Sequence, residues 1–403
     1  MEYDSESGLY LTNNSGSPEQ STTAPYIEYL SKNPSYVPRS STYDQGLAYS
    51  NYKHVIDALE IIPESSLSPA NKKTLGRIRE QINKLDPIPV GCSGQVKEFR
   101  EENFYGEIGE PEHRHISHLG ALHPSSVINN VDSPAWLDAA RVTLNGRGNN
   151  QGWGWSYAVR ALGWARVGGA EQAYDSIRGE ILATLGDNLC TLCYGMFQVD
   201  GNLGTPSAIC EMLLQSHEGY IAPLAALPSK WKSGSYSGLV ARGAFEIGAV
   251  WENGFAKKIT VTSKKGGICR LKYFNADKSE LKDSLGNDLP YSSENPDVIS
   301  FMTTAEQSYT LVPKGSCDIA AALEELKFSR SDGKVKLSWT SAKNAACYNV
   351  YKAEGSSPEY ETLVRCVAET EYCVDECRTP CTYAVCAVSK DGRESIRKTV
   401  RVL

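Results

Sequence analysis

The spacing of the apolar residues in this 403-residue chain changes near Pro223. Before Pro223, apolar residues recur at steps of three and four, which places them on one face of a helix. One such stripe runs from residue 48 to residue 62 (Ala48, Tyr52, Val55, Leu59 and Ile62). From Leu239 onward, apolar and polar residues alternate between glycine-containing turns, as they do in β-strands. The sequence therefore predicts a helical region followed by β-structure.

The helical region contains several amphipathic segments joined by loops. The spacing predicts helices over residues 72–85, 134–144, 155–167, 169–185 and 205–216. Ser133 and Pro134 form an N-cap and first-turn pair for the second of these. Repeated amphipathic helices favour a helical barrel or toroid over a sheet.

The last 80 residues contain strand-like segments separated by turns. They resemble a fibronectin type III module, because Trp339 falls on an early strand, the run YNVY occupies 348–351, and Tyr383 falls on a later strand. Trp339 and Tyr351 are the core residues predicted for this sandwich. The predicted domains are therefore a helical part (1–225), a small β domain (226–320) and a β-sandwich (324–403).

Charge and cysteine content limit the partners of this chain. With 41 basic and 48 acidic residues the net charge is −7, which argues against nucleic acid or an anionic membrane as the main partner. No apolar run reaches the roughly 18 residues that span a bilayer, and the first residues lack the features of a signal peptide. The six C-terminal cysteines fit either disulfides of an exported protein or buried thiols (Cys347, Cys366, Cys373, Cys377, Cys381 and Cys386).

The segment EHRHISHL, residues 112–119, holds three of the six histidines. His115 and His118 could share a helical face and bind a metal with His113, but the segment lacks an H-E-x-x-H pattern, and Arg114 would repel a cation. Arginine and histidine together also bind the hydroxyl or carboxylate groups of a polar ligand. A packed structural loop is the third interpretation.

Two carboxylates lie at segment starts where they could serve catalysis. Glu19 follows Ser17-Pro18, a helix-start pair that predicts Glu19 in a first helical turn, where the helix dipole alone would favour it. Asp200 lies in a glycine-rich turn before a predicted helix, where it could point into a cavity or only cap the turn. Nearby tryptophans could form a sugar platform or a helix-packing core (Trp153, Trp155 and Trp164).

In order along residues 8 to about 265, the motifs SPE, GQVKEF, HRHISHL, GWS, WAR, QVDGNLG, EMLLQSHEGYI, LPSKW and ARGAFEI occur. This combination resembles the C-terminal half of glycoside hydrolase family 95. The family comprises inverting α-L-fucosidases that remove terminal fucose, typically α-1,2-linked to galactose. The resemblance implies an (α/α)6 barrel flanked by β domains, which needs neither a metal nor another cofactor.

The resemblance also implies roles for individual residues. The general acid would be Glu19 of the SPE motif, and the second catalytic carboxylate would be Asp200 of the DGN motif. Arg114 and His115 would contact the sugar. GQVKEF departs from the family pattern at Phe99, where the family has tryptophan. Two more residues are therefore carried over only as pocket-lining, substrate-binding residues (Gln95 and Glu98).

An inverting mechanism needs an acid on one face of the sugar and an activated water on the other. In the family, a pair of asparagines upstream of the SPE motif orients this water, and Asn13-Asn14 does not have the expected Asn-x-Asn spacing. We therefore expect an incomplete barrel, from a fragment, a gene remnant, or a split protein completed by a second chain.

The family resemblance thus implies an exo-acting glycosidase for terminal α-L-fucosides or the similar α-L-galactosides, and the fibronectin-like module favours a location outside the cell or on its surface. A catalytically inactive glycan-binding protein and a metalloenzyme centred on residues 113–118 are the alternatives. Nucleic-acid binding and membrane insertion are not expected.

Overall fold

The computed structural model describes residues 1–403 except 13–14, 21–23, 35–39, 149–152, 315–319, 332, 376–378 and 391. Asn13, Asn14 and Cys377 therefore lie outside the described residues. The chain divides into two compact units: Met1–Gln151 together with Ala320–Leu403, and Gly152–Ile319. The predicted domain bounds at 225 and 320 stay a prediction.

The first unit contains the N-terminal helices. A hairpin of β1 (Glu2–Asp4) and β2 (Leu9–Leu11) precedes α1 (Ala24–Lys32), α2 (Thr42–Ala58), α3 (Pro69–Gln81) and α4 (Pro134–Arg147). Short 3-10 helices lie at Glu64–Ser66, Ile82–Lys84 and Ser117–Leu119. Long loops between α3 and α4 carry the GQVKEF and HRHISHL motifs. The helical region predicted for this part of the chain is thus confirmed.

Ser133 does not cap α4 in the way the sequence predicts. The helix begins at Pro134, but the Ser133 hydroxyl makes no cap hydrogen bond. Instead it donates to the carbonyl of Val127 at 2.8 Å and accepts the backbone N–H of Asn129 at 2.9 Å. The preceding loop has taken the hydroxyl because its own buried backbone groups need partners.

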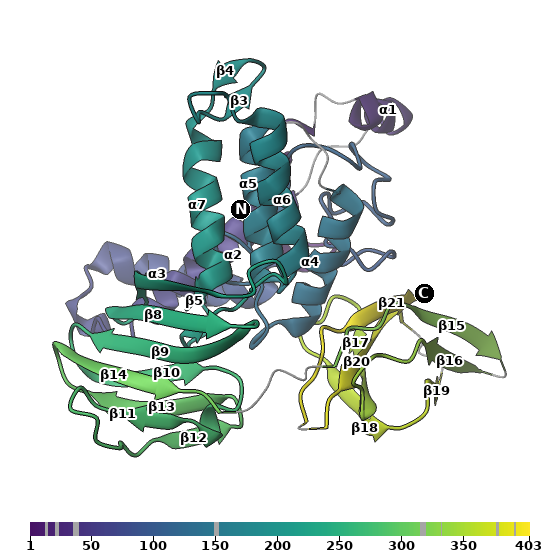
Figure 1. Cartoon of the computed structure of the whole chain (residues 1–403). Coiled ribbons are helices and arrows are strands. Elements are labelled where there is room, and N and C mark those ends of the chain that lie inside the picture. Colours follow the sequence, from purple (N-terminus) through teal and green to yellow (C-terminus); the bar gives the residue numbers. More distant parts are fainter. Residues whose placement is uncertain are drawn as a thin grey trace. The chain divides into compact units, whose positions relative to one another are not determined.

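The C-terminal part of the first unit is a sandwich of two antiparallel sheets (Figure 1). One sheet has the order β15 (Leu326–Ser331), β16 (Lys334–Trp339), β19 (Glu371–Asp375). The other has the order β18 (Glu361–Val367), β17 (Cys347–Glu354), β20 (Cys381–Val388), β21 (Lys398–Val402). Trp339 and Tyr383 pack between the sheets, whereas Tyr351 is buried in a smaller cluster with Ala384 and Cys386.

The second unit begins with three helices that lie side by side in Figure 1: α5 (Gly154–Arg166), α6 (Ala170–Thr184) and α7 (Val199–Leu213). Two short hairpins flank α7: β3 (Leu192–Cys193) with β4 (Met196–Phe197), and β5 (Leu214–Gln215) with β6 (Ala222–Pro223). The predicted start of α7 at residue 205 is wrong by six residues. Trp164 is buried, as a helix-packing residue would be.

The β part of the second unit has two antiparallel sheets. The larger has the order β11 (Glu280–Lys282), β14 (Gln307–Val312), β9 (Phe255–Ser263), β8 (Phe245–Glu252), β7 (Gly234–Ala241). The smaller has the order β10 (Gly267–Lys272), β13 (Val298–Thr303), β12 (Ser292–Asn295), with a 3-10 helix at Ala276–Lys278. Both sheets contribute to one apolar core, which includes Ile247, Ile259 and Ile299. A helical N-terminal region followed by β-sheet domains is therefore the arrangement of the chain.

Candidate active site

Glu19 lies in a tight turn. The backbone N–H of Gln20 donates to the carbonyl of Ser17 at 3.2 Å, which closes a four-residue turn over Pro18 and Glu19. Glu19 has a φ of 62°, a left-handed conformation that is unfavourable for a residue with a side chain. Proline followed by a residue with positive φ is the pattern of a type II turn. The predicted placement of Glu19 in a first helical turn is wrong, because a right-handed helix requires a negative φ.

The carboxylate of Glu19 meets two side chains of the HRHISHL segment. The Arg114 guanidinium donates to Oε2 of Glu19 through Nη2, and Nε2 of His115 lies 3.1 Å from the same oxygen. The Glu19 side chain is 50% exposed, whereas that of His115 is 18% exposed. The structure therefore brings three of the predicted site residues together at a point that solvent can reach.

His113 holds the HRHISHL segment in place through contacts with His115 and Arg114. It is buried, its Nδ1 accepts the backbone N–H of His115 at 3.2 Å, and the two imidazole rings stack with centroids 5.0 Å apart. Nη1 of Arg114 lies 3.4 Å from Nε2 of His113. Within the described residues no three histidine, cysteine, aspartate or glutamate side chains are placed to hold a metal ion. The segment thus presents an arginine and a histidine as hydrogen-bond donors.

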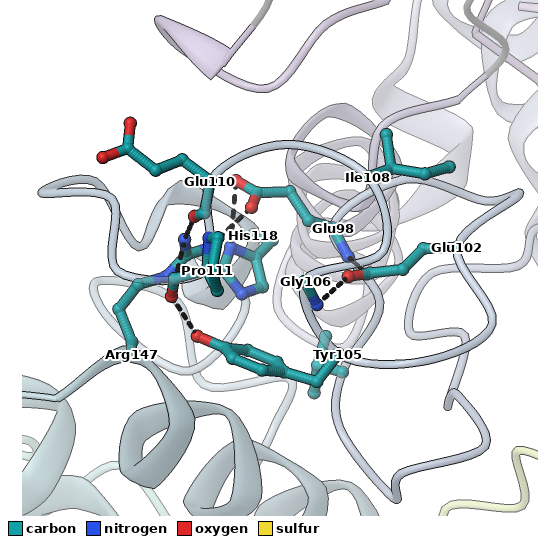
Figure 2. A pocket seen from close by; sticks show the side chains of 10 residues that line it. Glu98, Glu102, Tyr105, Gly106, Ile108, Glu110, Pro111, His118 and Arg147 are labelled. Carbon is teal, nitrogen blue, oxygen red and sulfur yellow. Dashed lines mark hydrogen bonds and ion pairs between the residues drawn. The ribbon is translucent and has the colours of Figure 1, made fainter. Parts of the chain in front are cut away.

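Glu98 lies in a buried cluster beside this turn (Figure 2). Its Oε1 accepts the Ser17 hydroxyl at 2.5 Å, and its Oε2 accepts the Gln20 amide at 3.0 Å and Nη2 of Arg147 at 2.6 Å. Nδ1 of His118 lies 3.4 Å from Oε1. Burial would raise the pKa of Glu98, but Arg147, His118 and the Ser17 hydroxyl together hold that pKa well below its ordinary value. Glu98 is therefore an ionised carboxylate that accepts several hydrogen bonds.

Glu102, which the sequence gave no reason to select, is a second buried carboxyl in this cluster. It accepts the backbone N–H of Glu98 at 2.8 Å and that of Gly106 at 2.9 Å, as the dashed line in Figure 2 shows for the latter. Burial raises the pKa of Glu102 to about 7, and the charge on Glu98 adds to the rise. Two adjacent glutamates thus have opposite pKa shifts, because only Glu98 contacts an arginine at close range.

The space around Glu98 is filled by side chains. Glu102, Tyr105, Ile108, His118 and Arg147 line it, and it leaves no room for a water molecule. Gln95 is also fully buried: its Oε1 accepts the backbone N–H of Ser93 at 3.1 Å, and its Nε2 donates to the carbonyl of Asn103 at 3.4 Å. In this structure Gln95 bonds to backbone groups and Glu98 bonds to side chains, and the sugar contact predicted for both stays a prediction.

Asp200 belongs to the second unit. It lies in the first turn of α7 and is exposed, rather than in a turn before the helix as the sequence predicts. Asn202 binds the loop across from it: Oδ1 accepts the N–H of Thr191 at 2.7 Å, and Nδ2 donates to the carbonyl of Leu189 at 2.8 Å. Oε1 of Gln198 accepts the N–H of Trp155 at 3.1 Å. The residues on either side of Asp200 thus fix the start of its helix.

Glu180 of α6, also missed in the sequence, is buried against this helix start. Thr205 donates to its Oε2, while Oε1 has no hydrogen-bond partner among the described residues. A Cβ atom added at Gly201 would lie 2.8 Å from Oε1 of Glu180 and 2.5 Å from Oγ1 of Thr191. Burial raises the pKa of Glu180 to about 7, and the Thr205 hydroxyl opposes the rise. Gly201 therefore lets the DGN segment approach α6 closely.

Two family models account for most of the chain. The model described as the glycosyl hydrolase family 95 catalytic domain matches residues 1–213. The model described as the glycoside hydrolase family 95 C-terminal domain matches residues 215–311. The chain belongs to glycoside hydrolase family 95.

Curated relatives of this chain are named as fucosidases. Alpha-L-fucosidase 2 of Arabidopsis thaliana is 33% identical over 278 residues, which cover 66% of this chain and 31% of that protein. Probable alpha-fucosidase A of Aspergillus oryzae is 28% identical over 252 residues, which cover 56% of this chain and 34% of that protein. The chain spans about a third of the length of these relatives.

Solved structures of fibronectin modules resemble part of this chain. A structure titled FN3tt is 21% identical, with a TM-score of 0.19, and covers 21% of this chain and 92% of its own. The FN3 domain of human collagen XX is 19% identical, with a TM-score of 0.18, and covers 23% of this chain and 98% of its own. At these TM-scores the likeness carries no argument, so the description of the sandwich rests on its own two sheets.

Proposed function

We propose that this protein is an exo-acting glycosidase that removes terminal α-L-fucose, typically α-1,2-linked to galactose, or the similar α-L-galactose. The observation that carries the proposal is the turn at Glu19, where Arg114 and His115 both contact one carboxylate oxygen. A non-glycine residue with positive φ costs free energy, and such residues cluster at functional sites. Arginine and histidine donors suit the hydroxyl groups of a sugar.

The proposed reaction is a single displacement with inversion. Glu19 protonates the departing glycosidic oxygen, the bond to the anomeric carbon breaks, and water attacks the opposite face of the ring. Asp200 acts as the base on that face and accepts the proton that the attacking water gives up. Arg114 and His115 bind the sugar. We further propose that the helices belong to an (α/α)6 barrel.

The test measures fucose release from a terminal α-1,2-fucosyl oligosaccharide. The Glu19→Gln and Asp200→Asn variants should lose turnover and still bind the glycan, whereas Glu60→Gln, at an exposed position outside the site, should behave as wild type. NMR of the freshly released sugar should show the inverted anomer, and a retained anomer would overturn the mechanism. Turnover that survives Glu19→Gln would overturn the role of Glu19.

The second candidate is a catalytically inactive glycan-binding protein. It would bind the same oligosaccharide and release no fucose in any variant.

We also propose an extracellular or cell-surface location, which the disulfide between Cys347 and Cys366 supports because disulfides persist in oxidising compartments. None of the described helices has the length and apolar character to cross a membrane.

A further inference from the structure

We propose that Glu98 is a positioning residue, which aims Glu19 by holding both ends of its turn. The inference rests on the proposed function, because it takes Glu19 to be the general acid. It assigns Glu98 a different part from the sugar contact expected for it. The evidence is the direction of the hydrogen bonds around Glu98, its burial, and the absence of space for a ligand beside it.

The first step is the pair of bonds to the turn. Ser17 and Gln20 are the first and last residues of the turn, and each donates a side-chain hydrogen bond to a different oxygen of Glu98. Among the described residues, the backbone hydrogen bond from Gln20 to Ser17 closes the turn, at 3.2 Å. Since Glu19 adopts an unfavourable φ, outside contacts must hold the turn in this conformation. Glu98 supplies two of them.

The second step is the anchoring of Glu98 itself. Arg147, at the end of α4, donates to Oε2 of Glu98 through Nη2 and to the carbonyl of Glu110 through Nη1 at 2.5 Å. The Glu110 N–H in turn donates to Oε1 of Gln20 at 2.9 Å. These bonds connect the turn, the end of α4 and the segment that leads to Arg114. One network thus sets the position of Glu19 relative to the arginine on its carboxylate.

The third step is the chemistry of the side chain. Three donors converge on Glu98, from Ser17, Gln20 and Arg147, and Nδ1 of His118 lies 3.4 Å from its Oε1. A carboxylate accepts at both oxygens, whereas the amide of glutamine accepts at one and presents N–H groups at the other. Glu98→Gln would therefore place an N–H group against a donor. Glu98→Asp is shorter by one methylene and could not reach both ends of the turn while keeping Arg147.

The experiment removes the hydrogen bonds to Glu98 by substituting residues of the turn. The buried Glu98 carboxylate then stays paired with Arg147. Ser17→Ala and Gln20→Ala are compared with Ser17→Thr, which keeps a hydroxyl, and with the exposed control Glu60→Gln. Each variant is measured on a fucosyl oligosaccharide and on an aryl α-L-fucoside with a nitrophenol leaving group. A nitrophenolate departs without a proton, so only the oligosaccharide depends on the aim of the acid.

We expect Ser17→Ala and Gln20→Ala to lower kcat on the oligosaccharide about 10- to 100-fold, the scale of a small misplacement of a catalytic group. KM should stay within about twofold, and kcat on the nitrophenyl substrate should fall far less. Ser17→Thr should recover most of the loss. Equal losses on both substrates, or no loss, would overturn the positioning role while Glu19→Gln still tests the proposed function by itself.

Hydrogen exchange gives a readout that does not need turnover. Glu98→Gln should raise amide exchange in a peptide containing residues 17–20 and leave α3 unchanged, because α3 has no hydrogen bond to this cluster among those described. Unchanged exchange at 17–20 in a folded Glu98→Gln protein would overturn the proposal even for an inactive chain.

Discussion

Asp138 of α4 and Arg397 of the C-terminal sandwich form a buried ion pair, with Nε of Arg397 2.7 Å from Oδ2 of Asp138. The two side chains are 1% and 14% exposed. The Arg397 guanidinium also lies 5.5 Å from the centroid of the Tyr360 ring, and Trp136 Nε1 donates to the carbonyl of Ser356 at 2.8 Å. Within the first unit, the sandwich therefore docks on the helix that also carries Arg147.

Breaking this pair should destabilise the first unit. Asp138→Asn removes a charge and leaves Arg397 buried with a neutral partner, a change that typically costs about 3 to 5 kcal/mol. The double variant Asp138→Asn with Arg397→Met should recover part of that loss, because it removes the buried Arg397 charge, although Arg141, which also pairs with Asp138, keeps its own. Urea unfolding measures each variant, with Arg79→Met of the exposed Arg79–Glu64 pair as the control that should lose less than about 1 kcal/mol. A loss in Asp138→Asn no larger than in the control would contradict the docking.

Two glycine-to-alanine substitutions in helices should change stability in opposite directions. At Gly76 in α3 an added Cβ meets nothing within 4 Å, so alanine should stabilise the helix by about 0.5 to 1 kcal/mol. At Gly201 in α7 the Cβ would clash with Thr191 and Glu180, so alanine should destabilise by about 1 to 3 kcal/mol. Thermal unfolding compares the two. A stabilised Gly201→Ala protein would show that the helix start is not tightly packed.

Arg114→Lys should lower kcat/KM on a fucosyl oligosaccharide about 100-fold, because lysine keeps the charge and loses the planar fork that spans Glu19 and His113. The matched control is Arg77→Lys, on the exposed surface of α3. Steady-state kinetics of both variants gives the comparison. Wild-type kinetics in Arg114→Lys would mean that a point charge is sufficient at this position.

The order of helices and strands could be predicted from periodicity, but the start of α7 could not. Gly201 and Gly204 are unfavourable inside a helix and Pro206 is favoured only in a first turn, so local preference favours a start near residue 205. The close packing explains why the helix nevertheless includes them: an added Cβ at Gly204 would lie 2.8 Å from that of Ala158. Tertiary contact has overridden propensity here.

The apolar stripe at residues 48–62 shows a second limit of prediction from periodicity. Its spacing correctly predicts a helix, but α2 ends at Ala58, before the last two residues of the stripe. Val55 and Ile62 are exposed and line a groove of about 630 Å³ with residues of α3, while Gln45 and Ser50 are buried. Periodicity identifies a helix without telling which face is covered. The neighbours of Gln45 explain its burial, because its amide donates to the carbonyl of Tyr10 and to the hydroxyl of Ser40.

The residues of the candidate site could be selected from the family resemblance, but the residues that hold them in position could not be predicted. Glu98 reaches Ser17 across 81 positions of sequence and Gln20 across 78, and no local spacing encodes such contacts. Glu102 and Glu180 carry no local sequence signal, because their burial comes from the fold. The signal for the Glu19 turn was the proline before it, which fits a type II turn as well as a helix start.

Glu180 should make the stability of the second unit depend on pH. In the unfolded chain its carboxyl has a pKa of 4.5, and in the folded protein burial raises the pKa to about 7. Between these values the folded protein holds a proton that the unfolded chain has released, so raising the pH through this window favours unfolding. The stabilisation is complete below pH 4.5 and is lost as the pH passes 7, and the rise corresponds to at most about 3 kcal/mol.

Glu180→Gln removes this titration, so relative to wild type the variant should become more stable by up to about 3 kcal/mol between pH 5 and pH 8. Urea unfolding at several pH values, followed by a probe in the second unit, measures the difference. Glu252→Gln, at an exposed position of β8, should show no such change. The pKa of Glu102 in the first unit is raised in the same direction, so the pH dependence of wild-type stability alone cannot be assigned to Glu180. The difference in stability between Glu180→Gln and wild type can be assigned to it. A difference that stays constant with pH would place the proton elsewhere.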